Sequence, residues 1–356
     1  MGNRHIFKAS LAIGSVLVLL FLVPARPGVC QVQASYTIVG LRPATTDSTS
    51  YARRINVSGQ VAGWSGYITG TDSRAVLWTP QAVQVLGTLP GGDYSASFSV
   101  NNAGQVVGTS NTGTVVRAFK WKRGGVMQDL GTLPGDNGSE ALDVNNSGEV
   151  VGVSSGPNGT RAVLWSNTGA IKNLGTLPGA DYSKAVAISD SHRVVGISGG
   201  PSGTHAFLWT SSGGMRDLGV LPGHTDSEAV GVNNAGQVIG SSTGPGGTRA
   251  FLWTDAGGMQ NLGTLPGGDY SNAFGINNAG QVVGTSTSTA GTRAFLWTAD
   301  GGMQDLNGLI PVGDSMVVLS EAHCINDAGQ IAAVSGGGHE VEHYYRVFLL
   351  TPNSPQ

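Results

Sequence analysis

Short runs rich in apolar, β-branched and aromatic residues recur along the chain, and clusters of Gly, Asn, Asp, Ser and Pro separate them. One representative stretch contains four such runs: Asn272–Ile276, Gln281–Thr285, Arg293–Thr298 and Met303–Leu306. Asn277–Gly280 follows the first run, and Asn and Gly supply the positive φ that a tight hairpin requires. The pattern predicts four short antiparallel strands. No helical periodicity of useful length occurs after the N-terminal segment.

This group of four runs is one unit of a repeat. Five units of 44 residues follow one another without a gap from Val85 to Gln304, and looser copies flank them at Tyr36–Gln84 and Asp305–Pro352. Four strands in a repeat of this size are typical of one propeller blade. Seven units therefore predict either a closed ring or an open array.

The two ends of the repeat array are out of phase. The chain opens, after its N-terminal segment, with a run of the fourth type at Tyr36–Leu41, and it closes with a run of the third type at Tyr345–Leu350. In a ring the first strand can complete the last blade and remove the exposed edges, whereas an open solenoid gains nothing from this offset. We therefore predict an all-β, seven-bladed β-propeller of four-stranded blades, closed by the N-terminal strand, and prefer it to a β-solenoid.

The same offset orders the strands within a blade. If the terminal strand is the outermost strand of its blade, the first run lies nearest the central axis. A small residue suits that crowded place, and every unit has one: Ala52, Ser97, Ala141, Ala185, Ala229, Ala273 and Ala322.

The N-terminal residues predict a targeting segment. A positive start precedes the apolar run Ala9–Val23, and small-residue cleavage patterns end at Ala25 and Ala34. We expect a signal peptide over residues 1–34, cleaved after Ala34 or Ala25, a single propeller over residues 35–352 and a disordered tail over residues 353–356. The alternative is an uncleaved anchor, which the short apolar run disfavours. Export predicts an extracellular or cell-surface location, with the periplasm as an alternative.

Composition and charge narrow the classes of partner. Charged residues make up 12% of the chain and the net charge is −3. Without a Lys/Arg patch we expect no nucleic-acid partner and no stable membrane insertion after signal cleavage. Neither Cys30 nor Cys324 has a metal or redox partner pattern, and the two can pair only if cleavage follows Ala25. We expect no cofactor and a monomeric protein.

Two columns of large residues recur on the third run. We interpret the Trp column as blade-to-blade core rather than a ligand-stacking set: Trp78, Trp121, Trp165, Trp209, Trp253 and Trp297. A cation column precedes it: Arg74, Arg117, Arg161, His205, Arg249, Arg293 and Arg346. These guanidinium groups can bridge backbone carbonyls or stack on aromatic rings. An anion-binding ring is the alternative.

Three further columns consist of small polar residues and glycine. A Ser precedes every first run and predicts a bond from the blade crossing to the backbone: Ser50, Ser95, Ser139, Ser183, Ser227, Ser271 and Ser320. Recurring Asn and Gly residues predict the hairpin turn after the first run. In the fourth unit His192 stands where the other units have Gly, which predicts a strained turn.

At these columns the chain resembles the HAF-repeat family of predicted extracellular repeat proteins. The family motif stands here as His205-Ala206-Phe207, and the other units read Arg-Ala-Phe, Arg-Ala-Val or Arg-Val-Phe. The block L-G-x-L-P-G … I/V-N-N-A-G-Q-V-V-G … A-F-L-W covers nearly all of the chain after its N-terminal segment. The resemblance implies an exported bacterial protein and a β-rich ring. It implies no established activity and no catalytic residues.

One face of the predicted ring carries the candidate ligand site. Loops that lead into the first strands share this face with loops between second and third strands. Acids beside aromatics suit sugars, because a ring stacks on an apolar sugar face while carboxylates accept hydroxyl hydrogen bonds. The candidate residues are Asp93, Tyr94, Asp181, Tyr182, Asp226, Asp269 and Tyr270. The alternative is turn composition with solvated acids.

The last unit departs most from the repeat. His339–His343 formally matches the H-E-x-x-H zinc motif, but that chemistry needs a helix, and glycines and a strand flank this segment. We interpret it as a loop insertion whose His339 and His343 contribute to the same ligand site.

These features favour a secreted or cell-surface binding module for a glycan or another extracellular polymer. One alternative is an extracellular polysaccharide lyase or hydrolase that uses the loop face or the central channel. The second is a structural envelope or matrix protein.

Overall fold

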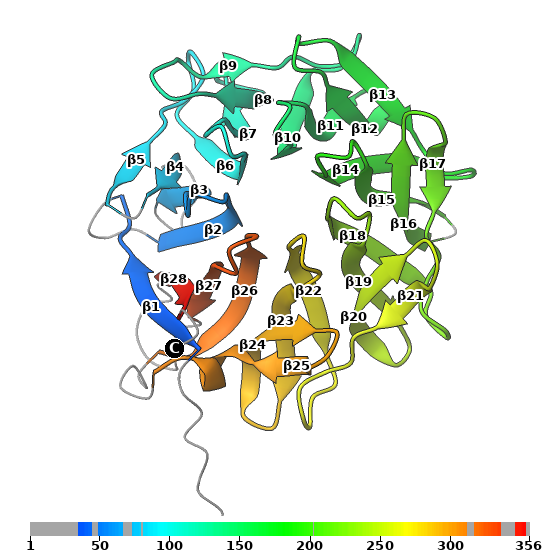
Figure 1. Cartoon of the computed structure of the whole chain (residues 1–356). Coiled ribbons are helices and arrows are strands. Elements are labelled where there is room, and N and C mark those ends of the chain that lie inside the picture. The colour runs from blue at the N-terminus through cyan, green and yellow to red at the C-terminus, as the bar shows by residue number, and fades with distance from the viewer. Residues whose placement is uncertain are drawn as a thin grey trace, which may run out of the picture. The chain divides into compact units, whose positions relative to one another are not determined.

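The computed structural model describes residues 35–44, 49–66, 73–79, 81–201, 203–311, 317–335 and 346–353. This part of the chain is all-β and contains a single short 3-10 helix, η1 (Leu306–Leu309). Seven four-stranded antiparallel sheets form the blades of a ring (Figure 1). The predicted seven-bladed propeller is confirmed.

Blades 1 to 6 each consist of four consecutive strands, given from the innermost strand outward. Blade 1 contains β2 (Thr49–Ile55), β3 (Val61–Gly66), β4 (Arg74–Trp78) and β5 (Val83–Val85). Blade 2 contains β6 (Ser95–Val100), β7 (Val106–Asn111), β8 (Val116–Trp121) and β9 (Gln128–Asp129). Blade 3 contains β10 (Gly138–Val144), β11 (Val150–Gly156), β12 (Gly159–Trp165) and β13 (Ile171–Gly175).

Blades 4 to 6 repeat the same order. Blade 4 contains β14 (Tyr182–Ile188), β15 (Val194–Gly200), β16 (Gly203–Thr210) and β17 (Gly214–Asp217). Blade 5 contains β18 (Asp226–Val232), β19 (Val238–Gly244), β20 (Gly247–Thr254) and β21 (Gly258–Asn261). Blade 6 contains β22 (Ser271–Ile276), β23 (Val282–Ser288), β24 (Gly291–Thr298) and β25 (Gly302–Asp305).

Blade 7 joins the two ends of the propeller. It contains β26 (Leu319–Ile325), β27 (Ile331–Ser335), β28 (Arg346–Pro352) and, as its outermost strand, β1 (Tyr36–Leu41). The β1–β28 ladder runs from Tyr36 opposite Pro352 to Leu41 opposite Val347. The N-terminal strand therefore completes the last blade, as the phase offset of the repeat predicted (Figure 1).

The apolar core is divided among the gaps between neighbouring blades. The six Trp residues of the column are all buried, and Leu350 occupies their place in blade 7. Trp253 and Phe251 of blade 5, for example, pack against Ala206 and Leu208 of blade 4. The core interpretation of the Trp column is confirmed.

Hydroxyl and guanidinium groups also join the blades. Ser95 Oγ accepts from the Ala75 amide of blade 1 at 2.9 Å and donates to the Gly87 carbonyl at 2.6 Å. Ser139, Ser183, Ser227 and Ser271 accept the equivalent amide bond. Arg74, Arg161 and Arg249 donate to the backbone carbonyls of Asp93, Asp181 and Asp269. In these blades both columns therefore bridge to the next blade through the backbone, as predicted.

Every innermost strand contains a bulge at the same position, which the sequence analysis did not predict. In blade 3 the β10–β11 register shifts between Ala141 and Asp143, so that Leu142 is an extra residue. The extra residues of the seven strands are Arg53, Phe98, Leu142, Val186, Val230, Phe274 and His323. A bulge re-aims side chains locally. These bulges determine which residues face the channel.

Candidate binding site in the central channel

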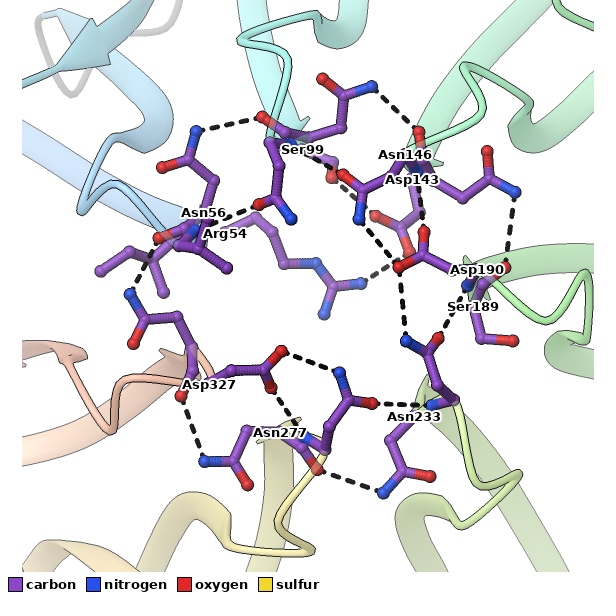
Figure 2. A pocket seen from close by; sticks show the side chains of 18 of the residues that line it. Arg54, Asn56, Ser99, Asp143, Asn146, Ser189, Asp190, Asn233, Asn277 and Asp327 are labelled. Carbon is purple, nitrogen blue, oxygen red and sulfur yellow. Dashed lines mark hydrogen bonds and ion pairs between the residues drawn. The ribbon is translucent and has the colours of Figure 1, made fainter.

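The central channel holds two cavities, one toward each end of the innermost strands. The wide cavity has a volume of about 520 Å³, and all seven extra bulge residues line it. The narrow cavity, of about 150 Å³, is lined by the hairpins that follow the innermost strands (Figure 2). Arg54 lines both cavities, so it marks the level at which they meet.

Two rings of polar bonds surround the narrow cavity. In the first ring an Asn side chain donates to the backbone carbonyl of the equivalent residue in the next blade, as from Asn56 to Asn101 at 3.0 Å. The same bond occurs at Asn101, Asn145, Asn233, Asn277 and Asn326, and the ring is interrupted where Ser189 replaces Asn (Figure 2). In the second ring a backbone N–H donates to the next Asn or Asp side chain, as from Asn102 to Asn146.

The Asn column therefore does more than form turns. Asn56 Oδ1 caps its own hairpin by accepting from the amides of Ser58 and Gln60, as the turn interpretation predicted. Its Nδ2 group at the same time ties blade 1 to blade 2. Since these amides are used in bonds between blades, we assign the narrow mouth to structure and the candidate ligand site to the wide cavity.

An ion pair forms the floor between the two cavities. Arg54 Nη2 of blade 1 lies 2.8 Å from Asp143 Oδ2 of blade 3. Asp143 also accepts from Ser99 Oγ of blade 2 at 2.6 Å and from the Ile188 amide of blade 4 at 2.9 Å. One nearly buried carboxylate thus binds four blades together and holds Arg54 across the channel (Figure 2).

The wide cavity has a polar rim above a largely apolar wall. Phe98, Leu142, Val186, Val230 and Phe274 supply the apolar wall. In blades 3 to 6 the residue two positions before the bulge residue is charged or polar and lines the rim: Glu140, Lys184, Glu228 and Asn272. A concave site with apolar walls and a few polar groups is the usual form of a small-ligand site.

Aromatic and charged side chains concentrate where the last blade meets the first. His323 of blade 7 contacts the ring of Tyr51, with centroids 4.5 Å apart, and stacks on Phe274 at 5.3 Å. Tyr51 stacks in turn on Trp64 at 5.9 Å. The guanidinium group of Arg53 lies 5.0 Å from the Tyr51 ring centroid and 5.5 Å from that of Phe98. We call Tyr51, Arg53, Glu321 and His323, together with the rings of Trp64, Phe98 and Phe274, the seam cluster.

A carboxylate lies beside the buried histidine of the seam cluster. Glu321 Oε2 lies at an ion-pair distance of 3.1 Å from His323 Nε2, although this buried nitrogen makes no hydrogen bond of regular geometry among the described residues. The contact with His323 and the charge of Arg53 lower the pKa of Glu321, although burial opposes them. On the other side of the ring, the Tyr51 hydroxyl lies 3.5 Å from His323 Nδ1. The cluster thus places a carboxylate on one side and a phenol on the other side of an imidazole that lines the wide cavity.

The predicted Asp–Tyr pairs lie outside the wide cavity. Asp93, Asp181 and Asp269 are exposed, and Tyr94, Tyr182 and Tyr270 are half-buried. Each pair belongs to the loop that enters a different blade, and the structure does not bring the three pairs into one cluster. Asp226 is bonded locally, because the Thr225 hydroxyl and the Thr204 amide donate to it and lower its pKa.

Other predicted features lie partly beyond the described residues. His339, His343, Cys30 and the N-terminal apolar run lie outside the described residues. Within the described ranges no group of three His, Cys, Asp or Glu side chains could hold a metal ion. No helix in the described part of the chain is long and apolar enough to span a bilayer. Cys324 is buried, and burial raises the pKa of its thiol to about 12.

The residues that line the wide cavity were not predicted from the sequence. A signal for them exists in the repeat itself. The positions on either side of the small inner residue vary strongly, from Tyr51 and Arg53 in blade 1 to Lys184 and Val186 in blade 4 and Glu321 and His323 in blade 7. Where other columns repeat for structural reasons, this variation marks side chains that face the ligand space instead of a neighbouring blade.

Comparison with solved structures supports the fold. No family model and no curated protein matches the sequence. Virginiamycin B lyase from Staphylococcus aureus is similar with a TM-score of 0.57 and 14% identity over 89% of this chain and 99% of that chain. Oligogalacturonate lyase in complex with manganese is similar with a TM-score of 0.57 and 11% identity over 90% of this chain and 97% of that chain. Puromycin hydrolase is similar with a TM-score of 0.59 and 14% identity over 87% of this chain and 55% of that chain. At these identities the similarity establishes the propeller fold alone.

Proposed function

We propose that the protein is an exported binding module that takes part of a glycan or another extracellular polymer into the wide cavity of its channel. The observation that carries the proposal is the cavity itself, with its apolar wall, charged rim and aromatic seam. The N-terminal apolar segment and the resemblance to HAF-repeat proteins support export. The regular bonds elsewhere in the ring make a rigid frame for this one variable surface.

The Asp–Tyr pairs extend the proposed site on the same face. Asp181 directly precedes β14, which begins at Tyr182 and carries Lys184 of the rim, and the pairs of blades 2 and 6 occupy the equivalent positions. A sugar unit in the cavity would leave the rest of a polymer to run across these loops. We therefore assign the cavity to recognition of one or two units and the Asp–Tyr pairs to contacts with the adjoining chain.

A glycan array followed by calorimetry tests this function. Val186→Trp and Val230→Trp fill the cavity and should abolish binding of the retained glycan, whereas Val126→Trp, at a position 87% exposed, should not. Replacing Asp93, Asp181 and Asp269 together by Ala should weaken polymer binding more than binding of a short oligosaccharide. Binding that survives both cavity variants would move the site out of the channel.

A second candidate function is cleavage of the bound polymer by acid–base chemistry. The observation that favours it is the arrangement of Glu321, His323 and Tyr51, in which the imidazole beside the cavity has a carboxylate 3.1 Å from one nitrogen and a phenol 3.5 Å from the other. Products released from polysaccharides, detected by mass spectrometry, test it. His323→Gln and Tyr51→Phe should abolish cleavage, and His205→Gln should not, although His205 has a similar partner in Asp217 at 2.7 Å. No product from any bound glycan would exclude this candidate.

A further inference from the structure

The seam between blades 7 and 1 lacks two bonds that most of the other seams have. Ser50 Oγ is buried without a hydrogen-bond partner among the described residues, whereas five of its six equivalents accept an amide of the preceding blade. Val57 stands where other blades place an Asn or Asp that accepts an amide of the preceding blade, as Asn102 does for Val57 itself. The seam cluster occupies the channel wall at the place where these repeated bonds are missing.

Arg53 is the member of the seam cluster whose polar groups remain available. Its guanidinium group lies between the rings of Tyr51 and Phe98, and the side chain is exposed. Within the described part of the chain, no carboxylate or carbonyl accepts a hydrogen bond from it. Arg54, next in sequence, is by contrast held by Asp143. A guanidinium group stacked between two rings keeps its N–H donors in its own plane, pointing away from those rings.

This geometry selects the chemistry of the ligand. A planar guanidinium group with free edge donors binds a carboxylate through two parallel hydrogen bonds. Glu321, the acid whose pKa the charge of Arg53 helps to lower, already has one oxygen 3.1 Å from His323 Nε2. Across the cavity Lys184 adds a second cation, while Glu140 and Glu228 can accept sugar hydroxyls. The apolar faces of Phe98 and Phe274 suit the C–H face of a sugar ring.

We infer that the ligand of the wide cavity is an acidic oligosaccharide whose uronate-type carboxylate binds the aromatic-clamped guanidinium group of Arg53. The inference rests on the proposed function and names its ligand class. It assigns Arg53 as the residue that distinguishes an acidic sugar from a neutral one. It also explains why an arginine stands at this one bulge position, where most blades carry an apolar residue.

Calorimetry with a matched pair of ligands tests the inference. The probes are tetragalacturonate and the same oligosaccharide as its methyl ester, which keeps the sugar rings and removes the charge. A panel of neutral oligosaccharides serves as the third arm. The purified protein should bind the acid about ten- to a hundredfold more tightly than the ester, because hydrogen bonds to a charged group provide that much discrimination. Added salt should weaken binding of the acid and leave binding of the ester unchanged.

Variants of Arg53 provide the second readout. Arg53→Gln should remove the preference for the acid, and Arg53→Lys should keep the salt dependence while losing most of the affinity. Arg216→Gln is the matched control, because Arg216 also stacks on a ring, Trp253 at 5.1 Å, but on the outer strand of its blade. Thermal melts of all three variants show whether the fold is retained.

The outcomes separate this inference from the proposed function. Equal binding of acid and ester, a preference that survives Arg53→Gln, or binding of neutral oligosaccharides alone would overturn the assignment to Arg53 and leave the binding module intact. Failure to bind any member of the panel would overturn both.

Discussion

Arg54 of the first blade and Asp143 of the third form an ion pair across the channel, with 2.8 Å between Nη2 and Oδ2. The carboxylate is almost buried and the guanidinium group is partly exposed to the cavity above it. Because Asp143 also bonds blades 2 and 4, the pair fixes the floor of the candidate site and braces the ring at the same time.

Removing this carboxylate should destabilise the protein strongly. Asp143→Ala leaves the charge of Arg54, the Ser99 hydroxyl and the Ile188 amide without their acceptor, so we expect a loss of about 3–5 kcal/mol in the free energy of unfolding. Chemical denaturation measures it. Asp129→Ala, which removes the exposed partner of Arg117 at 3.1 Å, should cost less than about 1 kcal/mol. A similar loss in the free energy of unfolding for the two variants would show that Asp143 does not hold the four blades together.

A disulfide across the closing ladder should stabilise the ring. Thr37 and Thr351 lie directly opposite each other in the β1–β28 pair. In a Cys30→Ser background, Thr37→Cys with Thr351→Cys should crosslink on oxidation and raise the free energy of unfolding by about 2–4 kcal/mol. Denaturation with and without reductant measures the gain. Failure to crosslink in the folded protein would place β1 elsewhere.

Relief of strain in the fourth blade should increase stability slightly. His192 has a φ of 59° and is the one non-glycine residue with positive φ in the described ranges, as the sequence predicted for this turn. His192→Gly should gain about 0.5–1 kcal/mol in thermal unfolding, despite the lost contact with Glu149 at 2.6 Å. The converse change, Gly104→Ala at a φ of 72°, should cost about 1 kcal/mol because space is not limiting there. A loss on His192→Gly would show that the contact with Glu149 outweighs the strain.

The seam cluster should make stability depend on pH in the acidic range. The pKa of Glu321 is lowered in the folded protein, so its contribution is present above the ordinary value of 4.5 and is lost as the pH falls through the lowered value. The difference in unfolding free energy between the native protein and Glu321→Gln should therefore shrink below that pH. Urea titrations over the acidic range measure it. Glu228→Gln, on the same rim, is the control, and a difference that stays constant with pH would contradict the assignment.

The buried thiol should be inert until the protein unfolds. Burial raises the pKa of Cys324 to about 12, so almost no thiolate is present at neutral pH and reagents have no access to it. Peptide mapping after iodoacetamide treatment should find Cys324 unmodified in the folded protein and modified in denaturant. Rapid modification of the folded protein would show that blade 7 opens.

The repeat made the fold predictable before any coordinates. Every unit contains the same pattern of strands and turns, so a run that is ambiguous in one unit can be assigned from the others. The phase offset between Tyr36–Leu41 and the last unit predicts that the first and last strands pair. The Trp column could be assigned to the core and the Ser and Arg columns to bonds between blades. Seven equivalent residues in a ring meet seven equivalent surroundings, and such positions satisfy packing and backbone bonds first.

The wide cavity was not predictable in the same way. It depends on a bulge after residues such as Ala52 and Ala141, and hydrophobic alternation carries no signal for a bulge. It depends also on which blades become neighbours across the channel, such as those that carry Arg54 and Asp143, 89 residues apart. The composition of the loops therefore predicted the Asp–Tyr pairs as the ligand site. The residues of the seam cluster lie in strands, and their pattern predicted core positions.

The amino-acid sequence by itself determined the number of blades, the order of strands within each blade and the closure by the first strand, because these follow from local patterns repeated at a constant period. Only the tertiary structure decided which side chains share the channel. Closing the ring brings Tyr51 beside His323, 272 residues apart, and no local pattern encodes a contact that exists only once both ends of the chain meet.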